Sequence, residues 1–318
     1  MKYGCTLPQR GPMAEPDALA IIARRAEELG FELLLHADHI VVPKSITSPY
    51  PYTSDGVFPG TATNEAMEQL TVLAFLAGQT SRIRLVTSVM IVPYRNPLVA
   101  ARALATLDIL SKGRLTVGVG VGWMKEEFEA LGLPPFEKRG AVADEYLRAY
   151  LELWTKDAPA FEGEYCHFSN ISFLPKPVQK PHPPIWVGGE SPRAFRRIAL
   201  YGNGWYFLDS NPKFPVRNPQ ELGTALQRLE AQLKLAGREL KEIDIVVRTT
   251  GYKLQSDAMT APARNFAGSA DKIAADIRGF AAMGAKYLVL DFVSRSRSRE
   301  EMLEHMEAFA TRVRPLVA

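Results

Sequence analysis

The chain has 318 residues, of which 47% are hydrophobic and 23% charged, and its formal net charge at pH 7 is +3. This is the composition of a folded globular protein, and because no basic stretch contains interleaved aromatic residues, we expect no nucleic-acid partner. No run reaches the roughly 18 apolar residues of a membrane span, no secretory segment opens the sequence, and two cysteines form no disulfide framework, so we expect a cytoplasmic protein without membrane contact.

Short apolar runs alternate with amphipathic segments along the whole chain. Residues 2–7 are expected to form a strand and residues 16–30 a helix, because Leu19, Ile22 and Ala26 recur at helical spacing. The later expected strands are residues 32–39, 82–92, 114–121, 183–189, 204–208, 242–252 and 286–292. The later expected helices are residues 67–80, 96–113, 191–202, 218–237, 269–284 and 298–316.

This strict alternation predicts an α/β fold. The strands are continuous Val, Ile and Leu runs, which is typical of parallel strands buried on both faces. Eight strand–helix units close most naturally into a (β/α)8 TIM barrel, with a doubly wound open sheet as the alternative. No linker or low-complexity segment divides residues 1–318, so we expect a single domain.

Two stretches interrupt the alternation. Residues 41–65 are long, rich in proline and aromatic residues, and follow the second strand, so in a barrel they would lie over the catalytic face as a lid or binding loop. Residues 161–184 are expected to form a small hairpin and a proline-stiffened lead into the fifth strand.

Three glycines at alternate positions, Gly118, Gly120 and Gly122, end the fourth strand. A dinucleotide fingerprint would have G-x-G-x-x-G spacing in the first strand–helix unit, so a nicotinamide site is disfavoured. Crowding in the barrel explains Gly118. Gly122 falls at the carboxyl end of the strand, where active sites form, and there we expect it to leave room for a flat ring.

The run "HADHI" ends the second strand on the same face. An H-x-D-H pattern resembles part of a hydrolase metal site, but three or more converging ligands are needed, and the remaining histidines do not end strands. We therefore expect no metal. An imidazole exchanges a proton near neutral pH, so the pattern also suits acid–base chemistry.

Glycine and capping residues follow the fifth strand. Gly188 and Gly189 make a tight turn, and Ser191 is a suitable N-cap for the next helix. Free amides at a helix start favour a phosphate, although a plain capped helix explains these residues equally well.

Four motifs in order resemble the bacterial luciferase-like superfamily of flavin- or deazaflavin-dependent oxidoreductases, and most closely its branch of probable coenzyme F420-dependent enzymes. They are "ADHIVVP", "RIRLVTSVMIVPYRNP", "GRLTVGVGVGWMKEEFEALG" and "PVQKPHPPIWVGGESPRAFRRIALYGNGW". The resemblance implies reduced coenzyme F420 or FMN as cofactor, a small organic substrate that is reduced or oxygenated, a homodimer, and a reductase that supplies reduced cofactor. A flavin-binding barrel without turnover and a metal-dependent hydrolase are the alternatives.

The resemblance also assigns residues. It places His39 beside the reactive face of the ring, with Asp38 fixing its tautomer or bonding the cofactor, while His36 is structural. It implies a non-proline cis peptide bond between Ser88 and Val89. The remaining implied cofactor contacts are Val121, Gly122, Gly188, Gly189, Glu190 and Ser191.

Aromatic residues are expected to wall the substrate pocket, since such side chains dominate pocket linings. The expected pocket residues are Trp123, Tyr50, Tyr52, Phe58 and Glu127. Family members that act on sugar phosphates place acids near the ends of the first and fourth strands, where this chain has "LPQRG" and "VGWMK". That departure argues against a sugar-phosphate dehydrogenase.

Overall fold

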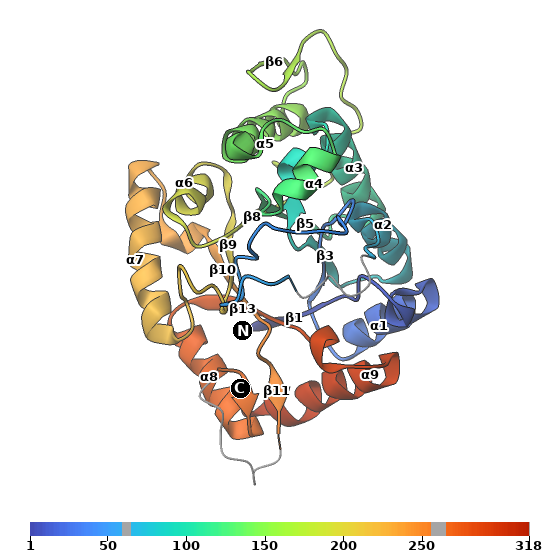
Figure 1. Ribbon diagram of the computed structural model, residues 1–318, viewed down its shortest axis with the longest axis vertical. Helices are drawn as coiled ribbons and strands as arrows, with labels where there is room; N and C mark the ends of the chain where they lie inside the picture. The colour runs from blue at the N-terminus through green and yellow to red at the C-terminus, as the bar shows by residue number, and fades with distance from the viewer. Residues whose placement is uncertain (59–64, 256–264, 318) are drawn as a thin grey trace.

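The computed structural model describes residues 1–58, 65–255 and 265–317, and shows the expected parallel barrel. Within the described residues, neighbouring strands pair in the order β3-β2-β1-β13-β10-β9-β8-β5. The two end strands, β3 and β5, also pair with each other, so the eight strands form a closed barrel. The barrel pairings are all parallel. The helices form a ring around the strands (Figure 1). The (β/α)8 prediction is therefore confirmed, and the open sheet is excluded.

Every barrel strand except β5 is followed by the helix that the sequence predicted. The barrel strands are β1 (Lys2–Thr6), β2 (Leu33–His36), β3 (Arg84–Thr87), β5 (Leu115–Gly120), β8 (Ile185–Gly188), β9 (Gly204–Leu208), β10 (Asp244–Thr249) and β13 (Ala285–Leu290). The expected helices are α1 (Pro16–Glu28), α2 (Gln69–Gln79), α3 (Pro97–Leu110), α6 (Pro192–Tyr201), α7 (Pro219–Leu235), α8 (Ala270–Ala282) and α9 (Arg299–Ala308).

The third expected strand is not continuous. A cis peptide bond between Ser88 and Val89 separates β3 from the short β4 (Met90–Ile91), which pairs with the end of β5. The cis bond confirms the expectation that came from the family resemblance. The prediction of one unbroken strand over 82–92 was wrong, because the pattern of apolar residues gives no sign of a cis peptide bond.

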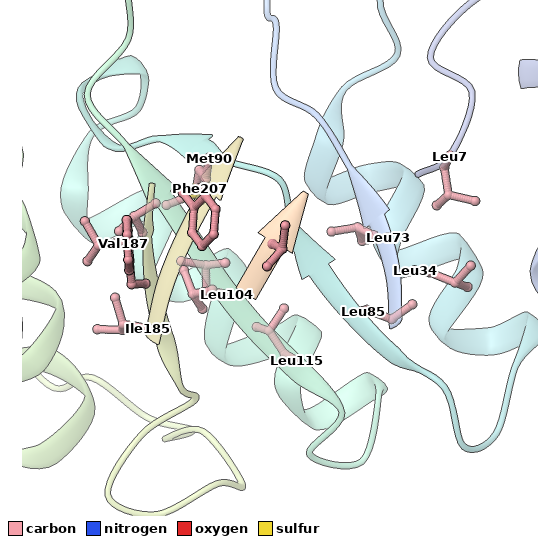
Figure 2. Close-up of a cluster of buried hydrophobic side chains, with 14 of the residues drawn as sticks. Leu7, Leu34, Leu73, Leu85, Met90, Leu104, Leu115, Ile185, Val187 and Phe207 are labelled. Carbon is pink, nitrogen blue, oxygen red and sulfur yellow. The ribbon is translucent and has the colours of Figure 1, made fainter. Parts of the chain in front are cut away.

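Two hydrophobic layers hold the barrel. Side chains between strands and helices form the larger cluster, and Figure 2 shows Leu34, Leu85, Leu115 and Val187 of the strands facing the helical layer that carries Leu73 and Leu104. A second cluster fills the lumen. Its buried members are Leu33, Leu35, Val86, Trp186, Tyr206, Val246, Tyr287 and Val289.

The connection between β5 and β8 holds helices that no sequence prediction assigned: α4 (Lys125–Ala130) and α5 (Arg139–Thr155). The expected hairpin is present as β6 (Phe161–Glu162) and β7 (His167–Phe168). A further short pair joins β11 (Lys253–Leu254) to β12 (Ala267–Gly268). Of the loop expected over 41–65, residues 59–64 lie outside the described residues. No helix in the described ranges is long and apolar enough to cross a membrane.

Candidate active site

The expected site residues follow four consecutive strands, β2, β3, β5 and β8, so the barrel brings them to one end. Asp38 and His39 follow β2, Ser88 and Val89 lie between β3 and β4, Val121 to Trp123 follow β5, and Gly188 ends β8. The carboxyl-terminal end of the strands is where TIM-barrel enzymes assemble their active sites. We call this end the barrel mouth.

His39 is held by a buried carboxylate. Its Nδ1 lies 2.8 Å from Oε2 of Glu127, and the side chains of His39 and Glu127 are 13% and 0% exposed. A carboxylate can only accept in such a contact, so Nδ1 carries the hydrogen, and Nε2 lies outside the contact with Glu127. The imidazole thus has one fixed orientation and one nitrogen free for proton exchange.

Glu127 is bound by three further donors. Its Oε1 accepts from the amides of Ile40 at 2.8 Å and Val41 at 3.2 Å, and its Oε2 also accepts the hydroxyl of Tyr94 at 2.8 Å. These hydrogen bonds satisfy a buried carboxylate that would otherwise be costly. Glu127 was expected in the substrate pocket; the structure instead engages its carboxylate with His39 and the segment after β2.

Of the two roles expected for Asp38, the structure contradicts the first, because Asp38 does not hydrogen-bond His39. Its two oxygens accept from both terminal nitrogens of Arg95 at 2.8 Å, and Oδ2 also accepts the amide of Ile91 at 2.8 Å. Arg95 reaches Glu68 as well, at 2.6 Å. Burial opposes the charge of Arg95, but the bonds to Asp38 and Glu68 raise its pKa. Asp38 therefore ties the segment after β2 to that after β4.

His36 is fully buried, and burial lowers its pKa to about 4, so the ring is neutral at physiological pH. This agrees with the structural role expected for it. Among the described residues, no group of three or more His, Cys, Asp or Glu side chains is placed to hold a metal ion.

The glycines after β5 permit close packing. A Cβ on Gly118 would lie 2.0 Å from the carbonyl oxygen of Thr87, which supports the crowding explanation. Gly122 has φ +83°, and a Cβ there would lie 2.7 Å from the ring of Phe128. Phe128 therefore occupies the space beside Gly122, and the expectation that this glycine makes room for a flat ring is not supported on that side.

The start of α6 has the expected cap. Ser191 Oγ accepts from the amide of Ala194 at 3.2 Å, and Gly189 has φ +106°. The amide of Gly189 donates to the carbonyl of Tyr206 at 3.2 Å, so it is not free for a phosphate. Across the described ranges, the amides of Ser191 and Arg193 have no intramolecular acceptor, so this turn offers them as donors.

Charges of both signs lie near this helix start. Burial lowers the pKa of Arg139, the charge of Glu137 raises it, and the charge of Arg193 lowers it. Glu190 turns away from them: its oxygens accept from the amide of Leu208 at 3.0 Å and the side-chain amide of Asn211 at 2.5 Å. Burial raises the pKa of Glu190 to about 7.

The expected aromatic residues form one cluster next to His39. Centroids of neighbouring rings are 5.1 to 5.5 Å apart for Tyr50 with Trp123 and with Tyr52, and Phe58 lies 5.3 Å from the ring of His39. Glu126 holds the same loop, because its Oε1 accepts from the amide and hydroxyl of Thr47 at 2.7 and 2.6 Å. The aromatic rings of the loop after β2 thus cover the barrel mouth next to His39.

The structure adds polar residues that the sequence interpretation missed. Ser88 Oγ lies 2.8 Å from the hydroxyl of Tyr206, which in turn hydrogen-bonds Arg248. The hydroxyl of Thr6 donates to Asp291 Oδ1 at 3.2 Å. We call this group of polar side chains at the barrel mouth, Ser88, Tyr206, Arg248, Thr6 and Asp291, the polar floor. The sequence could have revealed Tyr206 and Arg248, because alternate residues of a strand point to the same side and both share a side with lumen residues.

Curated relatives match up to about two thirds of the chain in sequence. An uncharacterized protein of Mycobacterium tuberculosis is 35% identical over 212 residues, which is 66% of this chain and 74% of that protein. The FMNH2-dependent dimethylsulfone monooxygenase of Pseudomonas putida is 37% identical over 146 residues, 45% of this chain and 40% of that enzyme.

Solved structures match over the full length. A monooxygenase from Streptomyces bottropensis superposes with a TM-score of 0.77 at 25% identity, covering 100% of both chains. The coenzyme F420-dependent tetrahydromethanopterin reductase of Methanopyrus kandleri has a TM-score of 0.76 at 20% identity, covering 100% of this chain and 99% of that one, and shows the same fold. The family model described as luciferase-like monooxygenase matches residues 1–312. The chain therefore belongs to the luciferase-like monooxygenase family.

Proposed function

We propose that this protein is an oxidoreductase that uses reduced coenzyme F420 or FMN to transfer hydride to, or to oxygenate, a small organic substrate at the barrel mouth. The observation that carries this proposal is the His39–Glu127 pair. A buried carboxylate with four bonded donors fixes one imidazole at the mouth of a luciferase-like barrel, with Nε2 unengaged by Glu127. Such a group is suited to proton transfer beside a redox cofactor.

The residues at the start of α6 fit the phosphate that both cofactors carry. Two amides without an acceptor among the described residues and the positive end of α6 favour a phosphate dianion, and the charges of Arg139 and Arg193 add to this while Glu137 partly offsets them. In this proposal the ring lies between that helix start and His39, against Ser88, Val89 and Val121. Gly188 and Glu190 shape the turn and do not themselves contact the phosphate.

When bound, the reduced cofactor supplies the electrons, as a hydride from the deazaflavin or through reaction with oxygen for FMN. The chain's own residues bind and orient it, and the aromatic cluster of Tyr50, Tyr52, Phe58 and Trp123 excludes water. Nε2 of His39 accepts or donates one proton, while Glu127 keeps the ring in the productive tautomer.

The two cofactors have different support. The Pseudomonas relative is named for reduced FMN and the Methanopyrus neighbour for coenzyme F420. We favour F420 because the sequence motifs most resemble that branch. We also propose a homodimer that pairs through α2 and α3, whose exposed side chains include Phe75 and Val99, at 39% and 64% exposure, and a reductase partner that supplies reduced cofactor.

Titration of the purified protein with F420 and with FMN, followed by cofactor fluorescence, tests the proposal. We expect saturable quenching at micromolar concentration, with tighter binding of F420. Failure of both cofactors to bind would contradict the proposed function, whereas tight binding of FMN alone would overturn only the preference for F420. Turnover of reduced cofactor with a substrate panel then separates an enzyme from a binding protein.

A further inference from the structure

The residues proposed to hold the cofactor occupy half of the barrel mouth. Around the closed sheet the strands follow the order β1, β2, β3, β5, β8, β9, β10 and β13. The proposed cofactor contacts come from β2, β3, β5 and β8, which are consecutive. The remaining consecutive strands, β9, β10, β13 and β1, enclose the other half, and Figure 1 shows their labels grouped on the side of the barrel away from β3 and β5. We call this the open half.

Arg248 lies in the open half and points inward. Val246 belongs to the lumen cluster, and alternate residues of a strand share a face, so the side chain two residues on faces the lumen near its mouth. The guanidinium bonds the hydroxyl of Tyr206, but its Nε has no hydrogen-bond partner. Among the described residues, no carboxylate oxygen lies within 4.0 Å of its nitrogens.

A buried guanidinium without a contacting carboxylate is costly, because its charge has left water without gaining a bonded counter-ion. The planar fork of arginine matches a carboxylate with two parallel hydrogen bonds. Arg248 lies near the mouth and retains partial solvent exposure, so a ligand in the mouth can reach it.

Nearby groups limit the charge of that ligand. Asp291, at the end of β13, and the hydroxyls of Tyr206 and Tyr50 interact electrostatically with Arg248. Oδ1 of Asp291 accepts from Thr6 and from the amide of Ser294 at 3.1 Å, which fixes this carboxylate in place. Arg248 supplies one positive charge, and Asp291 holds a negative charge near it. A ligand with one negative charge therefore fits better than a dianion, which Asp291 would repel more strongly.

We propose that Arg248 determines substrate specificity by binding a monoanionic oxygen group of the substrate, a carboxylate or a group of the same charge and shape, in the open half of the mouth. This inference rests on the proposed function, in which the other half holds the cofactor. Tyr50 and Tyr52 also interact electrostatically with Arg248, so their hydroxyls belong to the surroundings of this group. The class of substrate is therefore a small organic monoanion.

Saturation-transfer NMR on the cofactor-loaded protein tests this inference. The probes are acetate, butyrate and benzoate, each compared with its neutral amide, together with phenyl phosphate at pH 8 as a dianion. In the wild type at least one carboxylate should bind about 10-fold more tightly than its amide, as expected for a charge-assisted bidentate contact. Arg248→Met should remove that preference, and Arg248→Lys should keep part of it. Asp291→Asn should improve binding of phenyl phosphate.

The controls separate this inference from the proposed function. Arg228→Met removes the same charge from an exposed position of α7 and should leave carboxylate binding unchanged. If no carboxylate outbinds its amide while the cofactor binds normally, the inference is wrong and the function stands. If Arg248→Met or Arg248→Lys weakens the cofactor about 10-fold, Arg248 belongs to the cofactor site, and the inference is also overturned. If no cofactor binds, the probes are titrated into the cofactor-free chain, where the same preference is expected.

Discussion

Replacing Glu127 by glutamine should reverse the tautomer of His39. In the wild type Oε2 accepts from both Nδ1 of His39 and the hydroxyl of Tyr94, while Oε1 accepts the amides of Ile40 and Val41. The side-chain oxygen of glutamine can still accept hydrogen bonds from the amides of Ile40 and Val41. Its NH2 group then faces His39 and must donate to Nδ1. The ring hydrogen moves to Nε2, which turns a proton acceptor at the barrel mouth into a donor.

The stability cost of Glu127→Gln follows from the same contacts. Two charge-assisted hydrogen bonds become neutral ones, and the hydroxyl of Tyr94 loses its acceptor, which together should lower the free energy of unfolding by about 2–3 kcal/mol. Urea denaturation measures this change. Glu129→Gln, on the exposed face of the same helix, is the matched control and should have almost no effect.

Nitrogen-15 NMR reads the tautomer directly. The chain has 5 histidines, and the His39 resonances are assigned by their loss in His39→Ala. We expect a protonated Nδ1 in the wild type and a protonated Nε2 in Glu127→Gln. A protonated Nδ1 in both proteins, or unchanged stability, would refute the role assigned to Glu127.

Four further predictions concern the remaining residues of the site and the oligomer. His39→Ala should lower turnover by about 10²-fold or more with little change in cofactor affinity, and near-wild-type steady-state kinetics would assign His39 a structural role. Burial raises the pKa of Glu190 to about 7 from the usual 4.5, so the protein should lose stability as the pH rises through that range, by about 3 kcal/mol in total. Glu190→Gln should abolish this dependence in denaturation curves measured from pH 4.5 to pH 8, and an equal slope for both proteins would count against it. Gly189→Val should weaken cofactor binding far more than Ser191→Ala, because valine disfavours φ +106° whereas loss of the cap leaves the backbone amides in place, and equal affinities in fluorescence titration would move the phosphate elsewhere. Light scattering should give a dimer at micromolar concentration and a monomer for Val99→Glu, and a monomeric wild type would remove the α2–α3 interface.

The barrel could be predicted because its signal is local. Continuous apolar runs mark the strands, and residues such as Leu19 and Ile22 recur at helical spacing and are buried in α1. The length and aromatic content of the loop after β2 also show in the sequence, and its described residues carry the expected aromatic cluster. The break at Ser88–Val89 came only from the family resemblance.

The pairing of the site residues could not be predicted, because partners lie far apart in the chain. His39 and Glu127 are 88 positions apart, and Asp38 and Arg95 are 57 apart. Asp38 is next to His39 in sequence, which made it the natural candidate to orient the imidazole. The barrel instead brings α4 beneath the end of β2, so a glutamate of that helix takes the role.

The polar floor was missed for a different reason. Apolar residues dominate β9 and β10, so Tyr206 and Arg248 were read as parts of buried strands. Only closure of the sheet shows that the lumen-facing positions near the mouth are polar while those below are apolar.

A crystal structure of the protein with oxidised F420 bound tests the central claim most directly. The account predicts the deazaflavin ring at the barrel mouth against Ser88 and Val89, with Nε2 of His39 within hydrogen-bond reach of the ring or of a water on it. It also predicts the first phosphate on the amides of Ser191 and Arg193. A ring bound outside the mouth, or a His39 whose Nε2 points away from it while Nδ1 still contacts Glu127, would contradict the account.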